Sequence, residues 1–193
     1  MGKTRLEAFS DGVIAILITI MVLEFKTPEG HDWAALRVLA PKFSAYALSF
    51  VFLGIYWNNH HHMFHVTKHV TGAILWANLH LLFWLSLVPF ATAWMGETSL
   101  APAPTAVYGG VMLLAGLAYY ILQTAIIASQ GAHSPLKAAI GSDAKGKISP
   151  AMYAVAIPTA LVYPWIAAAI YVAVALIWLV PDPRIERRQH ELS

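Results

Sequence analysis

Six long apolar runs are the feature that most constrains how this chain folds. The runs cover residues 5–25, 36–57, 72–95, 106–129, 148–162 and 165–180. A helix that crosses a bilayer needs about 20 predominantly apolar residues, and the first four runs reach that length. Of the 193 residues, 59% are hydrophobic and only 11% are charged, whereas charged residues make up roughly 25% of a soluble domain. The sequence therefore predicts an all-α membrane protein, with one domain over residues 1–193 and six transmembrane helices.

The composition also excludes several classes of function. The chain contains no cysteine, which removes disulfides, thiolate zinc sites and cysteine nucleophiles from consideration. A formal net charge of +2 is too small to indicate a nucleic-acid partner. The connections between the apolar runs are too short to hold a soluble catalytic domain. We therefore expect no enzymatic activity, no cofactor and no bound nucleic acid.

The last two runs fit either one very long helix or two short ones, and Pro158 and Pro164 favour a break between them. With six spans, nine of the twelve Lys and Arg residues fall on one side of the membrane: Lys3, Arg5, Lys68, Lys137, Lys145, Lys147, Arg184, Arg187 and Arg188. The other side holds Lys26, Arg37 and Lys42. Because cytoplasmic loops are enriched in Lys and Arg, we predict a multi-pass protein of the plasma membrane with both termini in the cytoplasm.

The first run has two different faces when successive residues are placed about 100° apart on a helix. Ser10 and Asp11 point to one side, and Asp11 lies deep enough in the span that its carboxylate needs hydrogen-bonding partners. The opposite side carries Arg5, Phe9, Gly12, Ile16, Thr19, Ile20 and Leu23. Periodicity alone leaves open whether this second face contacts lipid, another helix or a pore. Arg5 and Glu7 also fit a plain position among lipid headgroups.

Within this run, Arg5-Leu6-Glu7-Ala8-Phe9-Ser10-Asp11 has the form Arg-x-x-x-Phe-Ser-Asp. The chain resembles prokaryotic members of the lysosomal/endosomal potassium channel family. The resemblance lies in this motif, in the length and six-span plan of the chain, and in its aromatic-rich third run. The resemblance implies a homotetrameric cation channel in a bacterial plasma membrane, with the first helix of each subunit lining a central pore. It further implies that Ile16, Ile20 and Leu23 form an apolar constriction, with Thr19 as the polar group near its narrowest level.

The sequence lacks the Thr-Val-Gly-Tyr-Gly segment that forms the carbonyl filter of common potassium channels. Rings of Ile and Leu exclude water but supply no oxygen atoms to replace the hydration shell of an ion. We therefore expect a hydrophobic gate with modest potassium preference, in which potassium ions are the permeant ligand and membrane lipid is the surrounding partner.

A histidine-rich segment, Asn58-Asn59-His60-His61-His62-Met63-Phe64-His65 with His69 beyond it, suggests an alternative function. His61, His62 and His65 have the spacing of a histidine box, as in a di-iron membrane oxidase or desaturase. Such an enzyme needs several boxes, and the remaining histidines are isolated in the sequence. We prefer the interpretation of a helix end whose histidines lie at the membrane interface and become partly charged at low pH.

The third run contains Trp76, Asn78, His80 and Trp84. His80 lies deep in the span, and buried imidazoles in membranes need partners. We expect Trp76, Asn78 and His80 to brace the helices, together with Arg5, Phe9, Ser10 and Asp11 of the motif. His80 is the predicted hydrogen-bond partner of Ser10 or Asp11, and the alternative for His80 is a bond to a backbone carbonyl.

Overall fold

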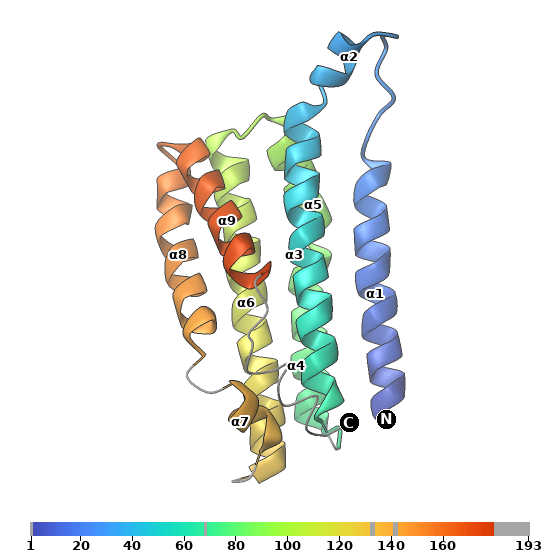
Figure 1. Cartoon of the computed structure of the whole chain (residues 1–193), viewed down its shortest axis with the longest axis vertical. Helices are drawn as coiled ribbons and strands as arrows, with labels where there is room; N and C mark the ends of the chain where they lie inside the picture. The colour runs from blue at the N-terminus through green and yellow to red at the C-terminus, as the bar shows by residue number, and fades with distance from the viewer. Residues whose placement is uncertain (1, 68, 132–133, 141–142, 180–193) are drawn as a thin grey trace.

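The computed structural model describes residues 2–67, 69–131, 134–140 and 143–179, and every regular element within them is a helix (Figure 1). The helices are α1 (Lys3–Leu23), α2 (Trp33–Arg37), α3 (Ala40–His65), α4 (Gly72–Ser86), α5 (Val88–Glu97), α6 (Pro102–Gln130), α7 (Pro135–Ile140), α8 (Ala144–Ala160) and α9 (Pro164–Leu179). The expected all-α class is therefore confirmed.

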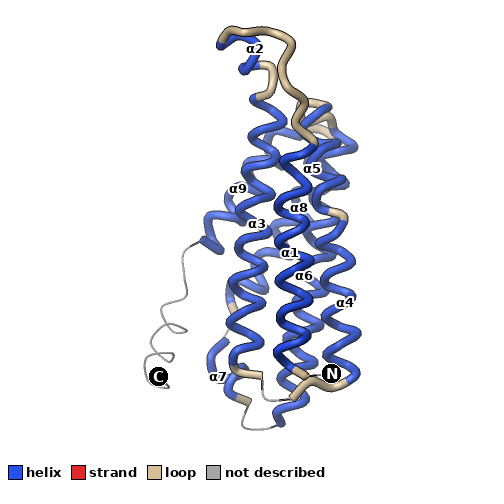
Figure 2. Tube along the Cα trace, turned by 90° about the vertical axis from the view of Figure 1, so that its right-hand side faces the viewer, coloured by secondary structure: helices blue, strands red, loops and turns tan. Residues whose placement is uncertain are grey.

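The long helices stand side by side in an upright bundle (Figures 1 and 2). Helix α1 forms one edge of the bundle and packs on α3, α4 and α5. Helices α8 and α9 form the opposite edge, where they pack against each other and against α6. The short helix α2 lies at one end of the bundle, whereas α7 lies at the other end, which is also the end at which α1 starts. Helix α1 thus lies at the periphery of the subunit.

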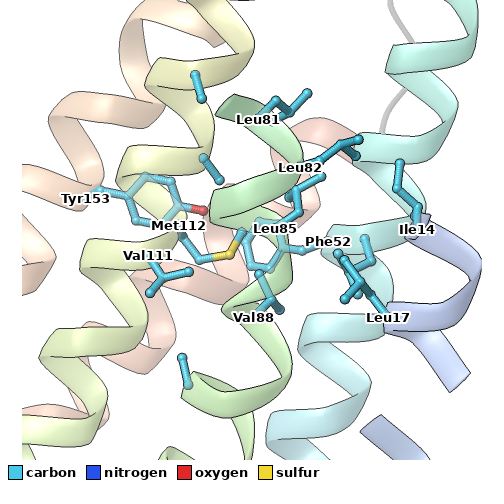
Figure 3. Close-up of a cluster of buried hydrophobic side chains, with 14 of the residues drawn as sticks. Ile14, Leu17, Phe52, Leu81, Leu82, Leu85, Val88, Val111, Met112 and Tyr153 are labelled. Carbon is cyan, nitrogen blue, oxygen red and sulfur yellow. The ribbon is translucent and has the colours of Figure 1, made fainter. Parts of the chain in front are cut away.

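The core forms where α1 meets its neighbours. Leu6, Ile14, Leu17 and Met21 of α1 are almost fully buried, at the three- and four-residue spacing that lines one side of a helix. Ile14 and Leu17 point toward a cluster that includes Phe52 of α3 and leucines of α4 (Figure 3). One side of α1 is therefore committed to packing within the subunit.

The second predicted run needs the largest correction. It was expected over residues 36–57, but the structure has the short helix α2 and then α3, which begins at Ala40 and continues to His65. Asp32 ends the preceding loop by accepting a hydrogen bond from the Ala35 backbone nitrogen at 3.0 Å, which caps α2. The histidine-rich segment lies beyond the predicted end of this apolar run and is the end of the long helix α3, as preferred in the sequence interpretation.

Proline positions explain two further differences. The third run is divided at Leu87 into α4 and α5, because Pro89 has no N–H to bond to the Leu85 carbonyl. The predicted break between the last two runs exists, but it lies at residues 161–163. Pro158 is inside α8, while Pro164 begins α9. The predicted break is therefore confirmed: it follows Pro158 by two residues at the end of α8, and Pro164 begins the next helix.

Three helical segments of the described chain are long and apolar enough to cross a membrane: Lys3–Leu23, Gly72–Glu97 and Pro102–Gln130. The apolar helix Pro164–Leu179 is shorter. Helix α3 ends in the polar segment from Asn58 to His65, and α8 begins with two lysines. The long helices overlap the six predicted runs, with the third run divided between α4 and α5, while six membrane crossings stay a prediction.

Candidate functional site

Helix α1 exposes a continuous apolar side to the exterior of the subunit. Ile16 is 56% exposed, Ile20 41% and Leu23 77%, whereas Ser10 and Ile14 on the other side are at most 1% exposed. Arg5, Phe9, Gly12 and Thr19 also lie on the exposed side. The two faces therefore lie where the 100° spacing placed them. No other part of the described subunit covers the side that carries the predicted pore-lining residues.

Thr19 is the one hydroxyl on the predicted pore-lining stripe. Its hydroxyl donates to backbone carbonyls of its own helix, at 3.1 Å to Ala15 and 2.9 Å to Ile16. Because the proton points back to the helix, the lone pairs of Oγ1 point away from these carbonyls. A ring of such oxygens would accept hydrogen bonds from water or contact a cation.

A buried chain of three polar side chains joins α1, α4 and α3. The Ser10 hydroxyl donates to the Leu6 carbonyl oxygen at 3.0 Å and accepts a hydrogen bond from Asn78 Nδ2 at 2.9 Å. Asn78 Oδ1 lies 2.8 Å from His60 Nε2. Since the amide nitrogen of Asn78 is used toward Ser10, its oxygen accepts, and His60 Nε2 carries the proton. All three residues are at most 1% exposed.

This row of hydrogen-bonded side chains joins three helices that also pack on one another through apolar residues. In a membrane, interhelical hydrogen bonds supply part of the association energy because the lipid tails are as apolar as the helices. His60 Nδ1 has no hydrogen-bond partner among the described residues, which fits a neutral imidazole with its proton on Nε2. The His60 ring also packs on Phe64, with ring centroids 4.5 Å apart.

Asp11 has the partner that its position in the span required. The indole nitrogen of Trp57 on α3 donates to Asp11 Oδ1 at 3.0 Å. Trp57 is itself stacked on His61, with ring centroids 6.4 Å apart. Asp11 therefore fastens α1 to α3 beside the buried chain, at a more exposed position.

The prediction for His80 was wrong. His80 lies on the exposed side of α4, where its Nε2 accepts a hydrogen bond from Trp84 Nε1 at 2.9 Å. Trp76, on the same side, is 76% exposed. The partner of Ser10 is Asn78, which is two positions away on α4 and so points about 200° away from His80. Of the three residues expected to brace the bundle from this helix, only Asn78 faces α1.

Two brace residues were missed by the sequence reasoning, His60 and Trp57. His60 was grouped with the neighbouring histidines as an interface residue. The helical spacing contained the signal for it, since His60 lies seven positions after Leu53 and three and four positions before Met63 and Phe64, and all four residues are buried. A helix extended through the histidine segment would have placed His60 on that side.

Among the residues that the structure describes, the other histidines are not grouped as a metal centre would need. The described residues contain no group of three or more His, Asp or Glu side chains placed to hold a metal ion. The rings of His61 and His65 lie side by side on α3 with centroids 6.4 Å apart, and the His61 and His62 rings with centroids 5.8 Å apart. His133 and His190 lie outside the described residues. The di-iron alternative is therefore not favoured.

The start of α1 is tied to the end of α3. Lys3 Nζ donates to the His65 carbonyl oxygen at 3.0 Å, where a cation also meets the negative end of the helix dipole. This contact places the positively charged start of α1 beside the histidine segment. Lys68 and the arginines of the tail, Arg184, Arg187 and Arg188, lie outside the described residues.

Comparisons with known proteins agree on one family. The family model of the endosomal/lysosomal potassium channel TMEM175 matches residues 5–89. A potassium channel of Chryseobacterium sp. (strain P1-3) is 56% identical over 191 residues, covering 99% of this chain and 100% of the relative. The human endosomal/lysosomal proton channel TMEM175 is 38% identical over 96 residues, which are 43% of this chain and 19% of the human protein.

A solved structure matches the whole bundle. The crystal structure of a lysosomal potassium-selective channel TMEM175 homolog from Chamaesiphon minutus superposes with a TM-score of 0.80 at 28% sequence identity. The match covers 92% of this chain and 96% of that chain. The fold and the two-sided first helix thus define a helical membrane protein of the channel class. The chain belongs to the TMEM175 family.

Proposed function

We propose that this chain is the subunit of a potassium-permeable cation channel in which four copies of α1 line a central pore. The observation that carries the proposal is the exposed apolar side of α1, which includes Ile16, Ile20 and Leu23. Helix α1 lies at the edge of the bundle. Its opposite side is held against three neighbouring helices by packing and hydrogen bonds. The Chryseobacterium relative is described as a potassium channel, and the Chamaesiphon homolog as a potassium-selective channel.

The constriction in this proposal is made of alkyl groups. Ile16, Ile20 and Leu23 would project toward the pore axis and gate it by excluding water. Thr19 adds one ring of hydroxyl oxygens between them, directed by its backbone hydrogen bonds. The sequence has no Thr-Val-Gly-Tyr-Gly filter, so the preference for potassium over sodium is expected to be modest.

The assembly and orientation follow from the same reasoning. A homotetramer is needed because one subunit supplies a single pore-lining helix. Six spans with cytoplasmic termini place nine of the twelve Lys and Arg residues on the inner side of a bacterial plasma membrane. Self-association, lipid contact and monovalent cations are then the chain's partners. The channel relatives support a function other than enzymatic catalysis.

The proposal is tested with the purified full chain in two measurements. Native mass spectrometry in a mild detergent should give the mass of four chains. Liposomes loaded with potassium and containing the protein should release potassium faster than empty liposomes, and sodium-loaded liposomes should release sodium at a lower but measurable rate. A monomer that still conducts, or a tetramer that conducts no cation, would contradict the pore model.

A further inference from the structure

A cavity of about 70 Å³ lies on the side of the subunit away from α1, among α3, α6, α8 and α9. None of its lining residues belongs to α1, α4 or α5. It is therefore separate from both the predicted pore-lining stripe and the polar chain from Ser10 to His60. Pockets between the helices of a bundle are common places for small ligands.

The wall of this cavity is mostly aromatic. Its aromatic lining comes from all four helices: Phe52, Tyr56, Tyr119, Tyr120, Tyr153 and Trp178. The polar atoms of two of these residues are bonded to the protein, since Trp178 Nε1 donates to Ser149 Oγ at 2.8 Å and Tyr119 donates to the Asn59 carbonyl oxygen at 3.3 Å. These bonds fix the two rings, so that ring faces and edges form much of the surface.

Asp143 is the one acidic residue in this lining. Its Oδ1 accepts a hydrogen bond from the Gly146 backbone nitrogen at 3.1 Å, and Gln123 Nε2 lies 3.5 Å from its Oδ2. A side chain at position 146 would collide with this carboxylate, so glycine there makes room for it. The cavity thus combines a negative charge with aromatic faces.

We propose that this cavity binds a small organic ammonium ion. The charge of Asp143 attracts a cation, and ring faces attract the same cation through their quadrupoles. A hydrated metal ion would gain little from the apolar wall, and an anion would be repelled. The occupant is a free ammonium ion rather than a phosphocholine headgroup, because the phosphate of a lipid would lie near the carboxylate and the space is small.

The test measures binding of labelled choline to the purified full chain by equilibrium dialysis. The uncharged control ligand is dimethylbutanol, which has a quaternary carbon in place of the quaternary nitrogen. Choline should bind, and dimethylbutanol should compete at least about tenfold more weakly, as loss of both charge attraction and the cation–π contact predicts. Short-chain phosphatidylcholine should compete more weakly than free choline.

The informative variant is Asp143→Asn, because asparagine caps helices as well as aspartate and tolerates the left-handed backbone of this residue, with φ of 43°. It should weaken choline binding about tenfold. The matched control is Asp32→Asn, which removes the same charge from the cap of α2, outside the cavity, and should leave binding unchanged. Tyr56→Leu should weaken binding more than Tyr56→Phe, which keeps the ring.

Three results would overturn the proposal. They are equal competition by dimethylbutanol, unchanged choline binding in Asp143→Asn, and absence of choline binding to the native chain. Tighter binding of short-chain phosphatidylcholine than of choline would also reject a free ammonium ion as the occupant. None of these measurements depends on ion conduction, so the cavity is tested independently of the pore.

Discussion

At the scale of single residues, the chain from Ser10 through Asn78 to His60 is the most constrained feature of the subunit. Each member has a hydrogen-bond partner on another helix. The Ser10 hydroxyl also donates to the Leu6 carbonyl oxygen of its own helix, and the Nδ1 atom of His60 has no hydrogen-bond partner among the described residues. An amide in the middle of the chain both donates and accepts, so its removal leaves two buried groups unpaired. Removal of Ser10 or His60, at either end of this chain, leaves only one buried group unpaired.

This difference predicts an order of effects. Asn78→Leu should lower the stability of the subunit more than Ser10→Ala does, because each buried polar group left unpaired costs about 1–3 kcal/mol. The measurement is the fraction of protein that stays monodisperse in detergent after heating over a series of temperatures. Asn58→Leu, an exposed position on α3, is the control for the same substitution and should change little. If Asn78→Leu were as stable as Asn58→Leu, the hydrogen bonds of Asn78 would not be what holds the three helices together.

Sequence reasoning placed Ser10 correctly but did not identify its partner on α4. The helical spacing correctly separated Ser10 from the exposed side of α1, because the polar residues Ser10 and Asp11 mark one side of an otherwise apolar helix segment. The same reasoning predicted His80 rather than Asn78 as the partner on α4. That helix is apolar on nearly every side, so the sequence does not indicate which side faces α1. Which of two polar residues about 200° apart faces α1 is decided by packing against α5 and α6.

At the scale of helices, α6 and α9 approach each other closely at Gly109. A methyl group on Gly109 would overlap the hydroxyl oxygen of Tyr171 and lie 3.1 Å from the nearest side-chain atom of Ile157. The Tyr171 hydroxyl is held in place because it donates to the Thr105 carbonyl oxygen at 3.0 Å. Small residues at such crossings let helices pack in membranes.

Gly109→Ala should therefore destabilise the bundle by about 1–3 kcal/mol, the range for overpacking a close contact. The neighbouring Gly110 provides the control, since nothing lies within 4 Å of a methyl group placed there. Gly110→Ala should be neutral or slightly stabilising, because alanine has the higher helix propensity. Thermal unfolding of both variants in the same detergent measures the difference. Loss of stability in both variants alike would show that the α6–α9 crossing is not the cause.

The apolar runs predicted the existence of the long helices and not their ends. Hydropathy indicates which segments can lie in a membrane, whereas caps and prolines determine where a helix begins or ends. Pro164 and Asp32 act in this way at the starts of α9 and α2. The histidine segment of α3 is polar and yet helical, so hydropathy ended that run too early. A buried face continued through it to Phe64, which only the packing of α3 makes visible.

At the scale of the whole molecule, the two proposed sites lie on different parts of the subunit. Helix α1 exposes the predicted pore-lining stripe at one edge of the bundle (Figure 1). The cavity with Asp143 is lined by residues of α3, α6, α8 and α9 and by none of α1. The polar chain from Ser10 to His60 lies on the inner side of α1 and orients it. The proposed channel therefore depends on the brace to direct Ile16 and its neighbours outward from each subunit.

Replacement of Ile16 by Asn tests this account most directly. Four amides at the narrow section would lower the barrier to water and ions, and a barrier lower by about 1.4 kcal/mol raises flux about tenfold. The control is Leu176→Asn on α9, because Leu176 is 57% exposed and Ile16 is 56% exposed. A substitution at Ile14, which is 1% exposed, would disturb the core and report misfolding instead.

Ion release from liposomes is measured for both variants at equal amounts of assembled protein, with potassium and with sodium inside. We predict a rise in flux for Ile16→Asn, with sodium gaining at least as much as potassium, and flux like that of the native chain for Leu176→Asn. Unchanged flux in Ile16→Asn, or an equal rise in Leu176→Asn, would contradict a pore lined by α1.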